Sequence, residues 1–264
     1  MRIAPDTEID DLLSRLTDDI RRSLDDSLVG LYVYGSLVTG DFDKEHSDID
    51  LLAVVRSDIE GHDFDRLDEM HERFIVDHPA WEDRVEVAYV SVPALRGFKT
   101  ETSDIAVVSP GEPFHVKEAG KDWLINWYMV REHDVALYGP SSRTLIPELS
   151  RAEFVEAVRK QSGDWTAWVY GMRRRGEQSY AVLTMCRALY ACTHGEQASK
   201  ERAALWAQSY LPQWAPLIQR ALSRRGQDEA ADDEETFPEV VRFVQDVVGR
   251  VTGTRDDRDP AAPG

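Results

Sequence analysis

The sequence predicts two domains: an α+β domain with a mixed sheet flanked by helices, followed by an all-α helical bundle. Up to about residue 150, short apolar segments rich in β-branched residues alternate with segments of helical periodicity. Beyond that point strand signals nearly vanish. A chain of 264 residues is long enough for two domains of ordinary size. We therefore expect domains at residues 1–150 and 151–252, with a disordered polar tail at residues 253–264.

The first domain is expected to open with a helix, because Ile9, Leu12, Leu16 and other apolar residues recur at helical spacing between Asp6 and Ser27. Two strands, a helix and a further strand are expected next. They span residues 28–34, 49–55, 64–76 and 84–90, respectively.

The segment from Ser91 to Gly120 has a weaker pattern, because Pro and Gly residues interrupt any long element. Only Ile105 to Val108 is identified there as a candidate strand. Apolar spacing then predicts a helix over Lys121 to His133, and the Gly139-Pro140 pair that follows is a strong stop signal.

The second domain is expected to consist of helices that form a bundle. Helical periodicity predicts them around residues 154–169, 179–193, 199–210, 214–224 and 237–251. The acidic stretch from Gln227 to Glu235 is predicted to be a surface loop.

The most informative motif is Gly35-Ser36 after the first expected strand, followed by Ser47-Asp48-Ile49-Asp50 at the start of the second. Residues two apart on a strand point to one face, so Asp48 and Asp50 are expected to present their carboxylates side by side. Such a pair needs a cation, and Mg²⁺ is usually held by one or two carboxylates plus substrate phosphates. The Gly-Ser turn can offer backbone N–H groups and a hydroxyl to those phosphates. An ordinary polar turn is the alternative, and the flanking apolar strands favour the metal site.

A third carboxylate is expected on a neighbouring strand, and Glu86 in the segment from Arg84 to Val90 is the best candidate. A charged residue inside an apolar strand is costly to bury without a partner. A metal ion, or a hydroxyl group to deprotonate, explains it. The alternative is an exposed glutamate on an edge strand.

The net charge is −18, from 31 Lys and Arg against 49 Asp and Glu. Such a surface repels phosphate backbones, so we expect no general binding of nucleic acid. A small cationic substrate would be attracted. Solubility, or adaptation to a salty cytoplasm, explains the acidity equally well.

No segment approaches the roughly 20 apolar residues that span a bilayer, and the N-terminal residues lack the apolar core of a signal peptide. The two cysteines, Cys186 and Cys192, lie six residues apart, roughly 240° around a helix, and are poorly aligned for a disulfide. We expect a cytoplasmic protein with no membrane contact that acts as a monomer.

The Gly35-Ser36 and Ser47-Asp48-Ile49-Asp50 segments together resemble the signature of the polymerase-beta-like nucleotidyltransferase superfamily. This resemblance implies that the two aspartates hold Mg²⁺ and that the Gly-Ser turn meets a nucleoside triphosphate. It does not identify the acceptor.

Three further segments resemble aminoglycoside adenylyltransferases of the streptomycin/spectinomycin 3''/9 type. They are Arg131 to Pro140, Ala181 to Tyr190 and Ser199 to Ala204. The likeness runs from about residue 28 to 250 in the same order of segments. It implies an N-terminal nucleotidyltransferase domain and a C-terminal helical substrate-binding domain, with ATP and drug bound between them.

The resemblance also implies roles for individual residues. Ser36, Ser47, Asp48 and Asp50 would serve the triphosphate and Mg²⁺, with Gly35 in the turn, and Glu86 would be the base. Arg187 and Lys200 would reach the phosphates from the second domain, since cations balance triphosphate charge. Without the resemblance, Arg187 and Lys200 would be interpreted as ordinary surface charges.

For the acceptor, Trp168 matches a tryptophan of the drug site and Glu177 matches an aspartate. Core packing is an equal alternative for Trp168. Arg173 occupies a position where streptomycin-modifying members have an acid. An arginine there would repel a guanidinium-bearing drug, so spectinomycin is favoured over streptomycin.

The predicted function is Mg²⁺-dependent transfer of AMP from ATP to a hydroxyl of an aminoglycoside or aminocyclitol-like molecule, which confers antibiotic resistance. One alternative is a nucleotidyltransferase that acts on protein or RNA. Another is a non-catalytic nucleotide sensor, against which the intact Asp48, Asp50 and Glu86 argue.

Overall fold

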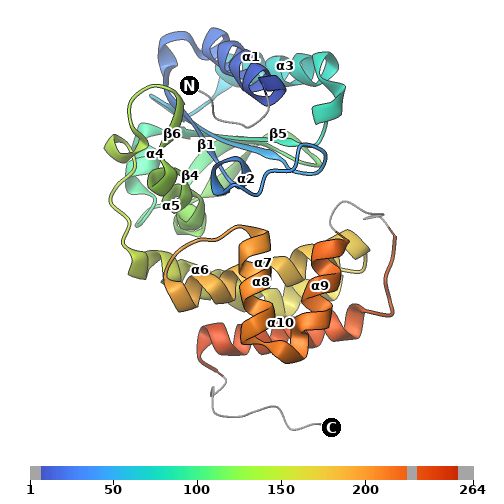
Figure 1. The fold of residues 1–264 in the computed structure, drawn as a ribbon. Coiled ribbons are helices and arrows are strands. Elements are labelled where there is room, and N and C mark those ends of the chain that lie inside the picture. The colour runs from blue at the N-terminus through green and yellow to red at the C-terminus, as the bar shows by residue number, and fades with distance from the viewer. Residues whose placement is uncertain (1–6, 225–230, 255–264) are drawn as a thin grey trace. The chain divides into compact units, whose positions relative to one another are not determined.

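The structure is a computed structural model that describes residues 7–224 and 231–254 (Figure 1). The chain divides into two compact units, Met1–Leu149 and Ser150–Gly264. The first unit contains all the strands of the described chain, and the second is helical. The predicted order of an α+β part followed by a helical part is confirmed.

The first unit is built on a six-stranded sheet with the order β5-β4-β3-β2-β1-β6. Strands β2 and β3 are parallel, and the other neighbouring pairs are antiparallel, so the sheet is mixed as predicted. The strands are β1 (Leu28–Tyr34), β2 (Ile49–Val55), β3 (Val85–Ser91), β4 (Ser103–Ser109), β5 (Glu112–Ala119) and β6 (Val135–Tyr138).

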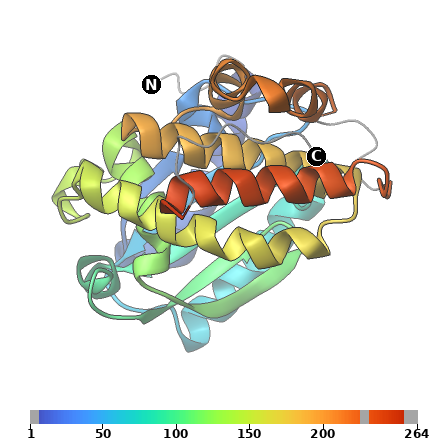
Figure 2. The ribbon, with the colours of Figure 1, turned by 90° about the horizontal axis from the view of Figure 1, so that it is seen from below.

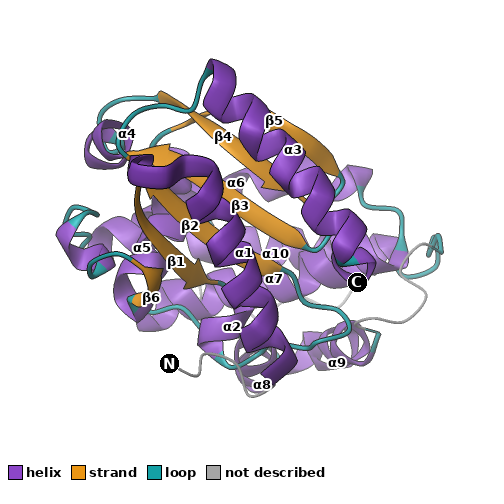
Figure 3. Cartoon of the chain, turned by 90° about the horizontal axis from the view of Figure 1, so that it is seen from above, coloured by secondary structure: helices purple, strands orange, loops and turns teal. Residues whose placement is uncertain are grey.

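Helices cover the sheet. They are α1 (Thr7–Leu24), α2 (Ser36–Thr39), α3 (Gly61–Asp77), α4 (Val92–Gly97) and α5 (Leu124–His133). Helices α1 and α3 lie side by side over one face (Figure 3), where their apolar residues form one core with alternate residues of β1, β2 and β3. Because side chains alternate along a strand, the intervening residues point to the opposite face.

The prediction was incomplete between residues 91 and 120, where the structure has helix α4 and the complete β4-β5 hairpin. Pro93 stands in the first turn of α4, where its missing N–H costs nothing. Pro113 lies on β5, an edge strand that tolerates proline. Gly111 turns the hairpin with φ = 75°. The breaker residues therefore mark a helix start and an edge strand here.

The segment before Gly139-Pro140 forms a strand that was not predicted. This strand, β6, pairs with β1 at the other edge of the sheet. Short 3-10 turns connect the elements of this unit. They are Asp25–Ser27, Pro79–Trp81, Lys121–Trp123 and Ser142–Thr144.

The second unit contains the predicted helices. They are α6 (Arg151–Trp168), α7 (Arg175–His194), α8 (Lys200–Tyr210), α9 (Ala215–Ser223) and α10 (Phe237–Thr252), with 3-10 turns at Val169–Gly171 and Pro212–Trp214. Helix α10 runs alongside α6 and α7 (Figure 2), and its apolar face is buried against them.

The acidic stretch predicted as a surface loop lies partly outside the described residues, at 227–230. Its remainder is not simply solvated, because Asp233 is buried and accepts from Arg224 Nη1 at 2.6 Å. Asp232 bridges to the backbone of Arg174. Ion pairing and a backbone bridge therefore bind this end of the loop to the bundle, a contact that composition does not reveal.

Two simpler expectations concern membranes and disulfides. In the described part of the chain, no helix is long and apolar enough to cross a membrane. Cys186 and Cys192 are free thiols, as predicted, and burial raises the pKa of Cys186 to about 12.

The buried His71 on α3 predicts a pH-dependent stability. Its Nε2 lies 2.8 Å from the Tyr89 hydroxyl, and burial lowers the pKa of His71 to about 3. An unfolded histidine takes up a proton near pH 6.5, so the unfolded state is favoured as pH falls from about 6.5 toward 3. We expect a loss of about 2 kcal/mol between pH 7 and pH 5 from this group.

Denaturant unfolding of wild type and His71→Gln at these two pH values measures the effect. The variant should lose less stability between them, because glutamine does not titrate. His62→Gln on the exposed start of α3 is the control. Equal pH dependence in wild type and His71→Gln would contradict the assignment.

Candidate active site

Three polar side chains form a row across the middle of the sheet. Tyr34 on β1 pairs with Asp50 on β2, and Asp50 pairs with Glu86 on β3. Residues opposite each other in register share a face, so the three side chains point the same way. The sequence-predicted Asp50 and Glu86 are therefore neighbours.

This row lies on the face opposite α1 and α3. The residues that alternate with Asp50, which are Ile49 and Leu51, are buried in the core beneath those helices. Asp50 is half-buried and Asp48, one residue before β2, is exposed. Both aspartates therefore lie at the start of β2, and Glu86 lies alongside Asp50.

Gly35 lies directly against Asp50. It follows β1 with φ = 69°, a conformation that side chains disfavour, and precedes the short helix α2 that begins at Ser36. A Cβ atom at residue 35 would overlap the Asp50 carboxylate. The glycine is therefore required both by its backbone angle and by the space that Asp50 occupies.

We expect Gly35→Ala to displace Asp50 and to reduce the activity of this site by at least about 10-fold, since a shift of about 1 Å at a reacting group is enough for a large loss. Gly40→Ala is the matched control. Gly40 has a similar φ of 79° but open space around its Cβ position, so it should lose only about 1–2 kcal/mol of stability. Steady-state kinetics and thermal unfolding of both variants separate the two effects, and equal losses would contradict the clash.

Glu86 is held by a hydrogen bond, because the Tyr34 hydroxyl donates to Glu86 Oε1 at 2.8 Å. Burial raises the pKa of Glu86 and the Asp48 charge raises it further, whereas the side chains of Tyr34, Lys117 and Ser109 oppose the rise. The net increase gives Glu86 more affinity for a proton than an ordinary glutamate, which suits a general base.

Three residues that influence Glu86 were not identified from the sequence. They are Tyr34 on β1, Ser109 on β4 and Lys117 on β5. Tyr34 directly precedes the Gly35-Ser36 motif, so that motif was the signal that could have found it. The other two depend on strand pairing, which residue spacing does not encode.

Ser47 has a supporting position in the structure. Its buried hydroxyl accepts from the Asp43 N–H at 2.9 Å. The Arg84 guanidinium donates to the Ser47 carbonyl at 2.8 Å. These bonds fix the loop that leads into Asp48.

The donor set fits a hard cation such as Mg²⁺, because Asp48 and Asp50 offer carboxylate oxygens and Gly35 leaves room for the Asp50 carboxylate. Within residues 7–224 and 231–254, no group of three or more His, Cys, Asp or Glu side chains is arranged to hold a metal ion. Glu86 therefore does not complete a ready three-carboxylate set with the aspartates here. Two carboxylates with substrate phosphates remain a normal Mg²⁺ environment.

Arg187 and Lys200 lie in the helical unit. The Gln197 side chain, with its amide oxygen toward the guanidinium, accepts from Arg187 Nε at 3.2 Å. Lys200 is the first residue of α8, and its Nζ lies 5.4 Å from the centroid of the Tyr180 ring. Both cations are half-buried.

Trp168 and Tyr180 belong to one aromatic group. Each ring centroid lies 5.8 Å from that of Trp165, and each side chain is 50% exposed. Core packing therefore does not explain Trp168. Glu177 has a structural contact as well, because its carboxylate accepts from the Arg174 N–H at 2.9 Å at the start of α7.

Arg173 is exposed and contacts two neighbouring side chains. Its Nη1 lies 3.1 Å from Glu234 Oε2, and its guanidinium lies 3.8 Å from the centroid of the Phe237 ring. The Arg173 charge is thus partly offset by Glu234.

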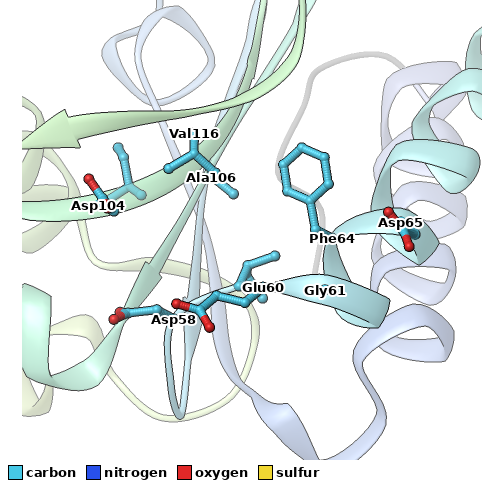
Figure 4. A pocket seen from close by; sticks show the side chains of 10 residues that line it. Asp58, Glu60, Gly61, Phe64, Asp65, Asp104, Ala106 and Val116 are labelled. Carbon is cyan, nitrogen blue, oxygen red and sulfur yellow. The ribbon is translucent and has the colours of Figure 1, made fainter.

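A separate acidic cavity of about 420 Å³ lies in the first unit (Figure 4). Asp58, Glu60, Asp65 and Asp104 are among its lining residues. The cavity lies beyond the carboxyl end of β2, whereas Asp50 is at the amino end of that strand. None of its lining residues is a site residue that the sequence predicted.

Comparisons with known proteins agree with this architecture. Residues 14–94 match the family model described as "Nucleotidyltransferase domain", and residues 144–250 match "Aminoglycoside adenylyltransferase, C-terminal domain". A solved spectinomycin adenyltransferase from Enterococcus faecialis, with ATP and spectinomycin, has the same fold. It superposes with a TM-score of 0.71 over 91% of this chain and 98% of that chain, at 17% identity.

Two curated relatives are similar along most of their length. An aminoglycoside (3'') (9) adenylyltransferase of Escherichia coli is 28% identical over 96% of this chain and 100% of the relative. A spectinomycin 9-adenylyltransferase of Staphylococcus aureus is 23% identical over 79% of this chain and 81% of the relative. In both domains and in their order, the chain is therefore similar to aminoglycoside nucleotidyltransferases of the streptomycin/spectinomycin 3''/9 adenylyltransferase type, and the predicted resemblance is confirmed.

Proposed function

We propose that this protein transfers AMP from ATP to a hydroxyl group of an aminoglycoside or aminocyclitol-like molecule. The observation that carries the proposal is the pairing of Asp50 with Glu86 on adjacent parallel strands, with Gly35 against Asp50. This places a candidate metal ligand beside a candidate general base. Nucleotidyl transfer needs both within reach of one α-phosphate.

In the proposed reaction, the acceptor oxygen attacks the α-phosphorus as the bond to pyrophosphate breaks. Glu86 takes the proton of the acceptor hydroxyl. Asp48 and Asp50 would hold Mg²⁺, which neutralises charge on the phosphates and the leaving pyrophosphate. The Gly35-Ser36 turn orients the triphosphate, and the bonds of Ser47 hold Asp48 in place.

We assign Arg187 and Lys200 to the triphosphate as charge partners. Both are cations of the helical unit, and cations balance the negative charge of a triphosphate. Arginine forms paired hydrogen bonds to phosphate, and lysine acts as a point charge.

We assign Trp168 and Glu177 to the acceptor. An exposed tryptophan can stack on a cyclic ligand and attract its ammonium groups, and a carboxylate pairs with them. Spectinomycin is favoured over streptomycin, because exposed Arg173 would repel a guanidinium group. Its ion pair with Glu234 reduces that repulsion, so the preference is expected to be graded.

A screen with ATP labelled in its α-phosphate tests the proposal. Wild type and Glu86→Gln are incubated with Mg²⁺ and with spectinomycin, streptomycin, a mixed protein fraction or total RNA. Label on a drug in the wild type alone supports the proposal. Label on protein or RNA, or on nothing, would refute it in favour of a macromolecular acceptor or a sensor. Minimum inhibitory concentrations in a sensitive host, with the same two variants, extend the test to resistance.

A further inference from the structure

We propose that Tyr34 is a positioning residue that holds the Glu86 carboxylate for proton transfer. The inference deepens the proposed function and rests on it. Tyr34 is 5% exposed, and its hydroxyl donates to Glu86 Oε1 at 2.8 Å. The residues lie on β1 and β3, so the Tyr34 side chain extends across β2 to reach its partner.

The direction of the Tyr34 proton follows from the contacts of the hydroxyl. A tyrosine hydroxyl has one proton to donate and lone pairs to accept. Its proton is used toward Glu86 Oε1, so the hydroxyl is aimed at that carboxylate.

Glu86 needs such a restraint because it has competing neighbours. Its carboxylate is close enough to Asp48 and Lys117 to feel both charges. Without Tyr34, Glu86 can rotate toward Lys117 or toward a cation held by the aspartates. Tyr34 occupies one oxygen and leaves acceptor capacity on the carboxylate, which has about four lone-pair sites, for the proton of a substrate.

The restraint should act on the chemical step and not on substrate binding, because it fixes a group that reacts only in the transition state. Removal of a supporting hydrogen bond typically costs about 10–100-fold in activity. We therefore expect Tyr34→Phe to lower kcat by about 10–100-fold. KM for ATP and for the acceptor should stay within about twofold of the wild-type values, because the change does not affect binding of either substrate in the ground state.

Tyr32→Phe is a matched control. Tyr32 lies two residues earlier on β1 and on the same face, is fully buried, and donates to the Pro140 carbonyl at 2.8 Å. Its variant also loses a buried hydroxyl bond but has no contact with Glu86. A loss of kcat caused only by a weakened fold would appear in both variants, whereas the positioning role predicts it in Tyr34→Phe alone.

Thermal unfolding of Tyr34→Phe and Tyr32→Phe keeps the test decisive, because kcat is then compared per folded protein. A positioning role lowers the kcat of folded Tyr34→Phe, whereas a folding defect lowers only the folded fraction. Undiminished kcat in a folded Tyr34→Phe, or equal losses in Tyr34→Phe and Tyr32→Phe, would overturn the inference and leave the proposed function intact. Absence of transfer by the wild type would overturn the proposed function and this inference with it.

Discussion

Glu86→Gln is expected to lower the rate of AMP transfer by about 10²–10⁴-fold, the range that loss of a general base usually causes. Affinity for Mg-ATP should remain nearly unchanged, because the base acts on the acceptor hydroxyl and not on the nucleotide. The glutamine oxygen can still accept from the Tyr34 hydroxyl, so the site should keep its shape. Single-turnover kinetics and calorimetric titration of Mg-ATP measure the two quantities separately.

Glu82→Gln is the control for this change. Glu82 is an exposed carboxylate just before β3 and should be replaceable without loss of rate. Weakened ATP binding with unaltered turnover in Glu86→Gln would show that Glu86 serves the metal or nucleotide instead. The two assignments of Glu86, as base and as metal ligand, predict opposite results.

Asp50→Asn is expected to weaken Mg-ATP binding and transfer together. Asparagine has nearly the same shape and fits against Gly35, but it removes the negative charge that a hard cation requires. Altering a mere supporting partner of a metal ligand costs about 10–100-fold, so loss of a ligand should cost at least that much. The Mg²⁺ concentration for half-maximal rate should rise.

Titration with ATP in the presence of Mg²⁺ or of a chelator distinguishes a metal effect from a fold effect. Asp58→Asn serves as the control, because Asp58 is an exposed carboxylate beyond the opposite end of β2. An unaltered Mg²⁺ requirement in Asp50→Asn would remove this residue from the metal site. Wild-type behaviour of Asp58→Asn would also show that the acidic cavity near it is not the source of the requirement.

Hydrophobic pattern alone predicted most of the fold. The strands around Tyr34, Asp50 and Glu86 are buried on at least one face and carry strong β-branched signals, so their positions agree with prediction. The strands at the edges of the sheet were harder to predict from this pattern. β5 and β6 alternate weakly or are short, and they exist because β4 and β1 offer unpaired edges. Pairing partners distant in sequence decide such strands.

The sequence by itself determined the chemistry available to this protein: the glycine turn, two aspartates at strand spacing, a glutamate inside an apolar strand, and the family resemblance of both domains. Only the tertiary structure decided which groups meet. The parallel register sets Glu86 beside Asp50, and Tyr34 reaches across β2 to contact Glu86. The physical reason is that residue type and spacing fix what a side chain can bind, whereas its neighbours depend on strand pairing and helix packing between segments far apart in the chain.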